Sequence, residues 1–281
     1  MSLNRLMLLA AAALLASGCD KLPERAGPGF DKARLEAALD PAVGGPDTCV
    51  LIEDVKSGAE VFRYGAQSVC NRPLAPCATF NIPLTLIGLD DAKVKPGETW
   101  TWDGKPQKFR LWERNTDLAG AWRSGAGWFF QKLARDIGPA RFKQQLSAFG
   151  YGQGEVVGDP ERFWLGPSEG GGLFISTRDQ ADFLRKAALG SLSVKPETIK
   201  AVQALQADQT RGDVTLTSQG ANCPSNHDAS RDVSWWVGRI QGPARDVVFA
   251  LSIESQNPLP GTEIRSRTLP ILTQAGLLPP G

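Results

Sequence analysis

One stretch limits what this chain can fold into more than any other. It runs from Pro76 to Asp90 and reads P-C-A-T-F-N-I-P-L-T-L-I-G-L-D. Its apolar side chains fall on every face of a helix: Phe80, Ile82, Leu84, Leu86, Ile87 and Leu89. A helix that is apolar all round is covered by other elements on every side, so the stretch predicts the core helix of a sizeable domain. Pro83 falls in its first turns, where a missing N–H is least costly. With 281 residues, 42% of them hydrophobic, the chain can build such a domain.

The first residues predict a targeting segment rather than a part of the fold. Arg5 precedes an apolar run, Leu6–Leu15, that is too short to span a bilayer. The run ends in L-A-S-G-C at Cys19, which resembles the lipobox of bacterial lipoproteins. The resemblance implies that Cys19 is lipidated and becomes the mature N-terminus. The alternative is an ordinary signal peptide that is cut after a small residue.

We therefore expect a lipoprotein signal peptide at residues 1–19, a flexible tether at residues 20–29 and one domain at residues 30–281. The tether is polar and contains Pro and Gly, which suits a linker. Through Cys19 the domain would be held on the lipid bilayer, on the periplasmic side of a bacterial membrane. Asp20, directly after the cysteine, favours the inner membrane.

Charge and histidine content restrict the functions that we expect. The formal net charge is +1, from 31 basic and 30 acidic residues, and no basic run stands out, which is against nucleic-acid binding. The single histidine, His227, lies in a polar stretch and is expected to be solvated. One loop histidine is a poor basis for Ser-His-Asp catalysis or for a histidine-ligated metal. We expect neither a metal nor a cofactor.

Four further cysteines follow Cys19, and they are Cys49, Cys70, Cys77 and Cys223. An even number in an exported chain predicts two disulfides, for which three pairings exist. The spacing of these cysteines does not resemble that of a zinc site.

Hydrophobic periodicity and turn residues predict the order of the elements. The expected helices, besides the core helix, are Phe30–Leu39, Trp128–Ile137, Ala140–Phe149, Ser176–Leu189, Pro196–Gln206 and Ile264–Ala275. The expected strands are Thr48–Val55, Glu60–Tyr64, Asp213–Ser218, Val233–Ile240 and Val247–Ile253. Thr177, followed three residues later by Gln180, has the spacing of a capping box. This order predicts an α+β fold, with one antiparallel sheet built from both chain ends and an inserted helical lobe.

The core stretch resembles the active-site helix of the class D β-lactamases, or oxacillinases, whose motif reads P-A-S-T-F-K-I-P. Further matches in the family's order are T-W-D-G-K-P from Thr101, L-W-E-R-N-T-D-L-A-G-A-W from Leu111, Tyr151-Gly152 and Trp164. The resemblance runs from about Thr48 to the C-terminus. It implies the penicillin-recognising fold shared by β-lactamases and penicillin-binding transpeptidases.

The resemblance also implies that the family's proton-handling groups are missing. Its acylated Ser and its Lys base fall on Ala78 and Asn81, its shuttle Ser falls on Gly125, and its strand Lys falls on Gln219. No catalytic residue is therefore expected. The aromatic matches are expected mainly to pack the core. The implied cleft is lined by Ala78, Asn81, Gly125, Trp164, Ser218, Gln219 and Arg265. The family's substrate-binding Arg falls on Arg265 or on Arg267, with a one-residue ambiguity in the match.

Two functions follow from this comparison. The first is a catalytically inactive binding or scaffolding module of the cell envelope, with peptidoglycan or an envelope protein as partner. The alternative is a β-lactamase or a peptidoglycan-acting serine or cysteine hydrolase with a non-standard site, for instance with Cys77 as a thiolate.

The family resemblance bears on the disulfides too. In the family, the helix that follows Cys77 and the strand that contains Cys223 line one cleft. The resemblance therefore implies a Cys77–Cys223 disulfide and leaves Cys49 to pair with Cys70.

Overall fold

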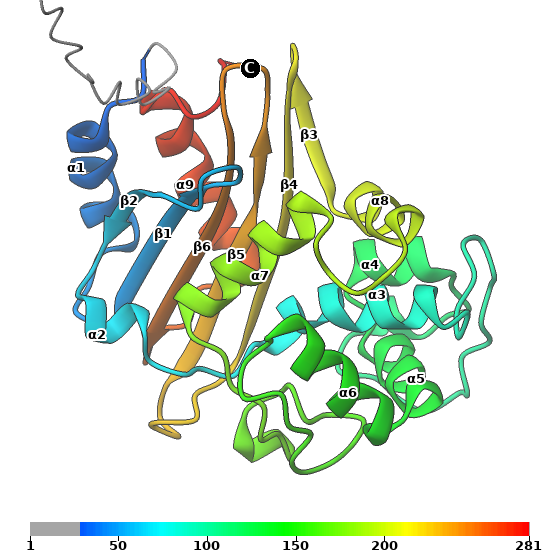
Figure 1. Cartoon of the computed structure of the whole chain (residues 1–281). Helices are drawn as coiled ribbons and strands as arrows, with labels where there is room; N and C mark the ends of the chain where they lie inside the picture. Colours follow the sequence, from blue (N-terminus) through cyan, green and yellow to red (C-terminus); the bar gives the residue numbers. More distant parts are fainter. Residues whose placement is uncertain (1–28, 281) are drawn as a thin grey trace, which may run out of the picture.

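The sheet at the centre of the molecule is built from both ends of the chain, as predicted. In this computed structural model, which describes residues 29–280, six strands lie in the order β2-β1-β6-β5-β4-β3. All neighbouring pairs are antiparallel. The strands are β1 Thr48–Asp54, β2 Glu60–Tyr64, β3 Ala207–Arg211, β4 Val214–Pro224, β5 Asp232–Gln241 and β6 Asp246–Ser255. The α+β architecture with an inserted helical lobe is confirmed (Figure 1).

Helices cover both faces of this sheet. On one face α1 (Lys32–Val43) and α9 (Gly261–Gln274) pack against each other, and on the other face α7 (Thr177–Leu189) crosses β1 and β6 (Figure 1). Strand β6 shows how the two cores are separated. Its Val248 and Ala250 belong to the core under the helical lobe, whereas Phe249 and Leu251 belong to the core under α1 and α9, because successive side chains of a strand point to opposite faces.

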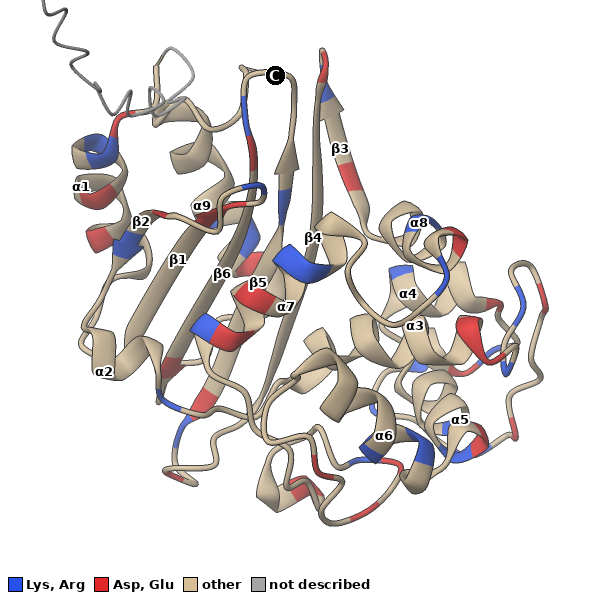
Figure 2. Ribbon diagram, in the orientation of Figure 1, with Lys and Arg blue, Asp and Glu red and all other residues tan. Residues whose placement is uncertain are grey.

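The helical lobe is inserted between β2 and β3. Its elements, with the short helix that leads into it, are α2 Gln67–Cys70, η1 Cys77–Phe80, α3 Asn81–Asp90, η2 Arg110–Trp112, α4 Leu118–Ser124, α5 Gly127–Ile137, α6 Pro139–Phe149, η3 Pro167–Glu169 and α8 Pro196–Leu205. Residues 81–88 of α3 are all buried, so the predicted core helix is confirmed. Figure 2 shows that basic and acidic residues are interspersed over the lobe and the sheet.

The core helix begins later than predicted. The α-helix starts at Asn81, and the preceding Cys77–Phe80 form a 3-10 turn. Pro83 has no N–H to give to the carbonyl of Thr79, so the α-helical pattern of hydrogen bonds is interrupted there. Cys77 has a positive φ of 53°, which marks a sharp entry into the turn.

Four other points of the prediction need correction. Strand β3 was not predicted, because its sequence A-D-Q-T-R has no apolar alternation, and β4 extends beyond Ser218 to Pro224. The cap of α7 is Ser176, not Thr177, and its hydroxyl accepts from the N–H of Asp179 at 3.0 Å. Helix α1 begins after Asp31, which caps it, and ends at Val43 rather than Leu39.

The signal peptide, Cys19 and nearly all of the tether lie outside the described residues. None of the helices within residues 29–280 combines the length and the apolar character that crossing a membrane requires.

Candidate functional site

The site is organised around η1 and the first residue of α3. Ala78 lies in η1 and is half-buried, and Asn81 opens α3 with 5% of its surface exposed. The Asn81 side-chain amide makes no hydrogen bond to any other described residue. A methyl group in η1 and, one turn later, a largely buried neutral amide at the start of α3 therefore lie near the point where η1 packs against β4 and β5.

A disulfide joins this turn to the sheet. Cys77 is bonded to Cys223 of β4, with 5.5 Å between their Cα atoms, and the Cys77 N–H donates to the carbonyl of Trp164 at 3.0 Å. The predicted Cys77–Cys223 pairing is confirmed. Cys77 is fully buried and bonded, so it supplies no thiolate in this state of the protein.

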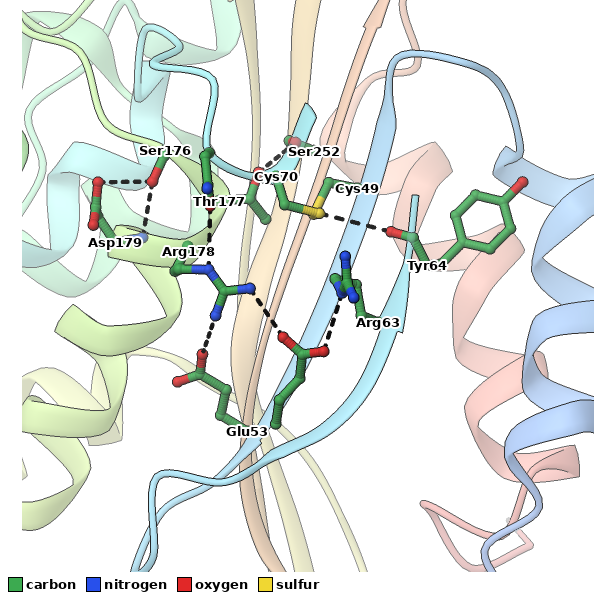
Figure 3. Close-up of a disulfide and its surroundings, with 12 residues drawn as sticks. Cys49, Glu53, Arg63, Tyr64, Cys70, Ser176, Thr177, Arg178, Asp179 and Ser252 are labelled. Carbon is green, nitrogen blue, oxygen red and sulfur yellow. Dashed lines mark hydrogen bonds and ion pairs between the residues drawn. A yellow bond between two sulfur atoms is a disulfide. The ribbon is translucent and has the colours of Figure 1, made fainter. Parts of the chain in front are cut away.

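The second disulfide is confirmed as well, and it lies at the β1–α2 corner of the sheet. Cys49 and Cys70 are bonded, with 5.2 Å between their Cα atoms. Figure 3 shows Arg178 beside this disulfide, reaching toward two carboxylates. Its guanidinium lies 2.9 Å from Glu60 and 3.8 Å from Glu53. Burial raises the pKa of Glu53, which Arg178 opposes. This cluster ties α7 to β1 and β2.

The segment that leads into η1 is clamped by the loop after β4. The Asn226 amide accepts from the Ala75 N–H and donates to the Pro73 carbonyl, both at 3.1 Å. His227 Nε2 lies 2.8 Å from the same Pro73 carbonyl, and the Trp235 indole donates to the Ala75 carbonyl at 2.9 Å. His227 is exposed but not simply solvated, so that expectation is corrected. Sequence analysis missed this clamp because its partners are backbone groups.

An ion cluster lies under the same segment. Asp47 accepts from Arg72 at 2.6 Å and from Arg231 at 2.8 Å. Arg72 also lies 3.1 Å from Glu254 of β6, whose side chain is almost fully buried. Hydrogen bonds from Arg72 and then Arg231 hold the pKa of Asp47 below its ordinary value of 3.8. The cluster fixes the approach segment and the β4–β5 loop to one end of the sheet.

Aromatic rings form the inner wall behind η1. Phe80 stacks on Trp164 with 5.2 Å between ring centroids and 19° between ring planes, and it meets Tyr151 edge-on at 5.8 Å. Burial raises the pKa of Tyr151, so its hydroxyl stays protonated and donates to Gln180 Oε1 at 3.1 Å. Trp164 is only 3% exposed. These aromatics pack the core, as predicted.

Gly125 is at an exposed position between α4 and α5. It ends α4 with a left-handed φ of 67°, and a Cβ built on it would meet no atom within 4 Å. The neighbouring Ser124 turns its hydroxyl back to the Gly120 carbonyl at 2.8 Å, and its own carbonyl accepts from the Trp112 indole. The proton of the Ser124 hydroxyl is therefore already used within α4.

Strand β4 divides the remaining predicted site residues between its two faces. Cys223 and Ala221 belong to the core under the lobe, and Gln219 shares their side by strand alternation, whereas Leu216 belongs to the opposite core. Ser218 is on the Leu216 side, where it donates to Asp208 at 2.7 Å. Its placement beside Gln219 in the cleft is therefore corrected.

The carboxylate of Asp208, which accepts from Ser218, also binds Arg265. The Arg265 guanidinium pairs with both oxygens of Asp208, and its Nε lies 2.6 Å from Oδ2. The hydrogen bonds that Arg265 donates to Asp208 raise the pKa of Arg265. Arg265 is thus not a free cation for a ligand carboxylate, because Asp208 on the unpredicted strand β3 already neutralises it. Nothing in the apolar pattern of the sequence marked that aspartate.

The residues left at the site are chemically neutral. Ala78, Asn81, Gly125 and Gln219 carry no group that titrates, and the Gln219 amide donates to the Gly220 carbonyl at 3.2 Å. Such a surface can exchange neutral hydrogen bonds and make van der Waals contacts. None of these four residues has a side chain that can act as a nucleophile or as a general base.

Comparisons with known proteins agree with this architecture. Residues 48–268 match the family model described as the penicillin-binding protein transpeptidase domain. The chain is 31% identical to beta-lactamase OXA-19 of Pseudomonas aeruginosa, over 66% of this chain and 69% of that protein. It is 30% identical to the probable beta-lactamase YbxI of Bacillus subtilis (strain 168), over 83% and 82% of the two chains. A crystal structure of a class D beta-lactamase from Bacillus subtilis superposes with a TM-score of 0.74 and 28% identity, over 86% of this chain and 97% of that one.

Proposed function

Because this chain belongs to the penicillin-binding protein transpeptidase family and is related to the class D β-lactamases, we propose that it is a catalytically inactive member of that family. In this proposal it acts as a binding or scaffolding module at the cell envelope. The observation that supports the proposal most is the pair Ala78 and Asn81, which occupy the positions of the family's nucleophile and base. A methyl group cannot attack a carbonyl carbon, and an amide cannot take up a proton at neutral pH.

The loss extends beyond these two positions. The shuttle hydroxyl is replaced by the exposed backbone of Gly125, and the strand cation by the neutral amide of Gln219. Removing a nucleophile or a base alone costs about 10⁶ in turnover in a serine hydrolase. The alternative through a Cys77 thiolate needs the bond to Cys223 to be reduced first.

The envelope role rests on the remaining groups and on the N-terminus. The free Asn81 amide and the Gln219 side chain suit neutral hydrogen bonds to a glycan or to a peptide, which makes peptidoglycan or an envelope protein the proposed partner. Lipid anchoring through Cys19 and a periplasmic location belong to the same proposal.

Intact-mass measurement after incubation with a labelled penicillin tests the catalytic part. We expect no mass increase, while a class D β-lactamase treated in parallel gains the mass of the acyl group. A stoichiometric adduct on this protein, or turnover of a chromogenic cephalosporin, would overturn the proposal in favour of the β-lactamase alternative.

Co-sedimentation with purified peptidoglycan sacculi tests the binding part. Asn81→Leu combined with Gln219→Leu removes both amides and should lower the bound fraction several-fold. Asp213→Asn, at an exposed turn residue far from η1 in the sequence, serves as the matched control and should bind like the wild type. Equal binding of all three proteins would exclude the site as the peptidoglycan-binding surface.

A further inference from the structure

The connection between α3 and α4 carries an exposed apolar patch. We call residues Lys105–Arg114 the tip loop; it belongs to the helical lobe, away from α1 (Figure 1). Phe109 and Leu111 are 52% and 56% exposed, and they are two of the four large apolar side chains of residues 29–280 that are exposed. The other two, Val157 and Leu189, stand alone in the sequence. Only the tip loop gathers two such side chains.

The tip loop is held in this conformation by hydrogen bonds from indole groups. Trp112 donates to the Ser124 carbonyl at 2.8 Å, and Trp128 donates to the Trp112 carbonyl at 2.8 Å. The Phe109 ring packs edge-on against Trp112, with 4.9 Å between centroids. The exposed side chains are therefore presented by a fixed backbone rather than by a loose coil.

Positive charge surrounds the two apolar side chains. The tip loop has four basic residues and one acidic residue, Glu113, whose carboxylate accepts from the Gln107 N–H at 3.1 Å. Lys108, Arg110 and Arg114 are exposed and form no ion pair with any described residue. The Lys108 ammonium lies 5.8 Å from the centre of the Phe109 ring. The chain as a whole is almost neutral, so this is a local excess.

We propose that the tip loop docks on an anionic lipid surface. Phe109 and Leu111 would enter the headgroup region, and Lys108, Arg110 and Arg114 would lie against lipid phosphates. Exposed aromatic and aliphatic side chains flanked by cations are the combination that binds a bilayer interface, because apolar burial and attraction to anionic lipids add. A glycan fits less well, because it stacks on a free ring face, whereas the Phe109 ring already makes a T-shaped contact with Trp112 and has Lys108 over it.

A local fluorescence measurement on the full chain tests the proposal. Cys19→Ala removes the expected acyl anchor, and Leu111→Cys introduces one free thiol for an environment-sensitive dye. We expect a blue shift and a several-fold rise in intensity with vesicles that contain phosphatidylglycerol. Pure phosphatidylcholine vesicles should give little change, and high salt should reverse the response because it screens the charges. The matched control is Leu189→Cys, at a similarly exposed position on α7, which should not respond.

A second measurement does not depend on the dye. In the same Cys19→Ala background, Phe109→Ser with Leu111→Ser should reduce co-sedimentation with anionic vesicles several-fold, whereas Leu189→Ser should not. Equal dye responses to both vesicle types, or an equal response at position 189, would overturn the proposal. A response to purified sacculi but not to vesicles would overturn it in favour of a glycan ligand.

Discussion

Cys77 and Cys223 are bonded, with their Cα atoms 5.5 Å apart and both side chains buried. Cys77 directly precedes Ala78, and Cys223 lies a short way beyond Gln219 on β4. The bond therefore fixes the separation of the two walls of the candidate site, η1 and β4. A ligand that binds there meets a site whose width is set covalently.

The two disulfides should differ in their effect on stability. Replacing both cysteines of the Cys77–Cys223 bridge by Ala should lower the free energy of unfolding by about 5 kcal/mol, against about 3 kcal/mol for the Cys49–Cys70 bridge. The reason is that the first bridge joins residues 146 apart in the sequence and the second joins residues 21 apart. Urea unfolding of the two double variants measures both losses. A larger loss for the Cys49–Cys70 pair would contradict the loop-entropy explanation.

Restoring the family's residues at the two central positions of the motif should not restore catalytic activity. Ala78→Ser with Asn81→Lys returns a nucleophile and a base, but Gly125 still offers no hydroxyl and Gln219 no cation. Each missing acid–base or electrostatic group costs about 10² to 10⁴ in rate. Steady-state assays with a chromogenic cephalosporin should therefore show little turnover until Gly125→Ser and Gln219→Lys are added. Turnover by the double variant at the level of a working class D enzyme would show that the missing groups were misidentified.

The ion cluster under the approach segment should make stability depend on pH. The pKa of Asp47 is lowered by Arg72 and Arg231, so its contribution is present above the ordinary carboxyl pKa of 3.8 and is lost as the pH falls through the lower folded-state value. Asp47→Asn should lower the free energy of unfolding at neutral pH, and this difference from the wild type should shrink in acid. Denaturant unfolding at several pH values measures it. Asp213→Asn is the control, and a pH-independent gap for Asp47→Asn would be the contrary result.

The N-terminal prediction is tested by cell fractionation. In membranes washed with high salt, which screens the attraction of the tip loop to lipid, Cys19→Ala should move the protein from the membrane fraction to the soluble periplasmic fraction, because the acyl chains that hold it would be absent. Wild-type protein without lipid, together with a variant that stays membrane-bound, would identify Cys19 as an ordinary signal-peptide residue.

Sequence reasoning worked where burial or family resemblance left a strong pattern. The all-round apolar stretch predicted α3, and strands β1, β2, β5 and β6 were found from their apolar runs. Both disulfides followed from the resemblance. In each of these features, many neighbouring residues of the sequence carry the same signal, either of burial or of family resemblance.

Prediction from the sequence failed where a single polar contact decides the structure. Strand β3 has no apolar face to report, and its Asp208 takes both Ser218 and Arg265 out of the predicted cleft. The clamp by Asn226 and His227 is directed at backbone carbonyl and N–H groups, which are common to nearly all residue types. Partners of that kind leave no periodic signal along the chain.

The position of β1 has a consequence for how the molecule forms. Thr48 pairs with Ile253, so β1 and β6, the first and last strands within residues 29–280, lie side by side. The sheet therefore cannot close until almost the whole polypeptide is available, and contacts of this sequence separation slow folding. Until β6 has been synthesised, the chain lacks the β1–β6 pairing, and its apolar strands stay open to non-native contacts for that time.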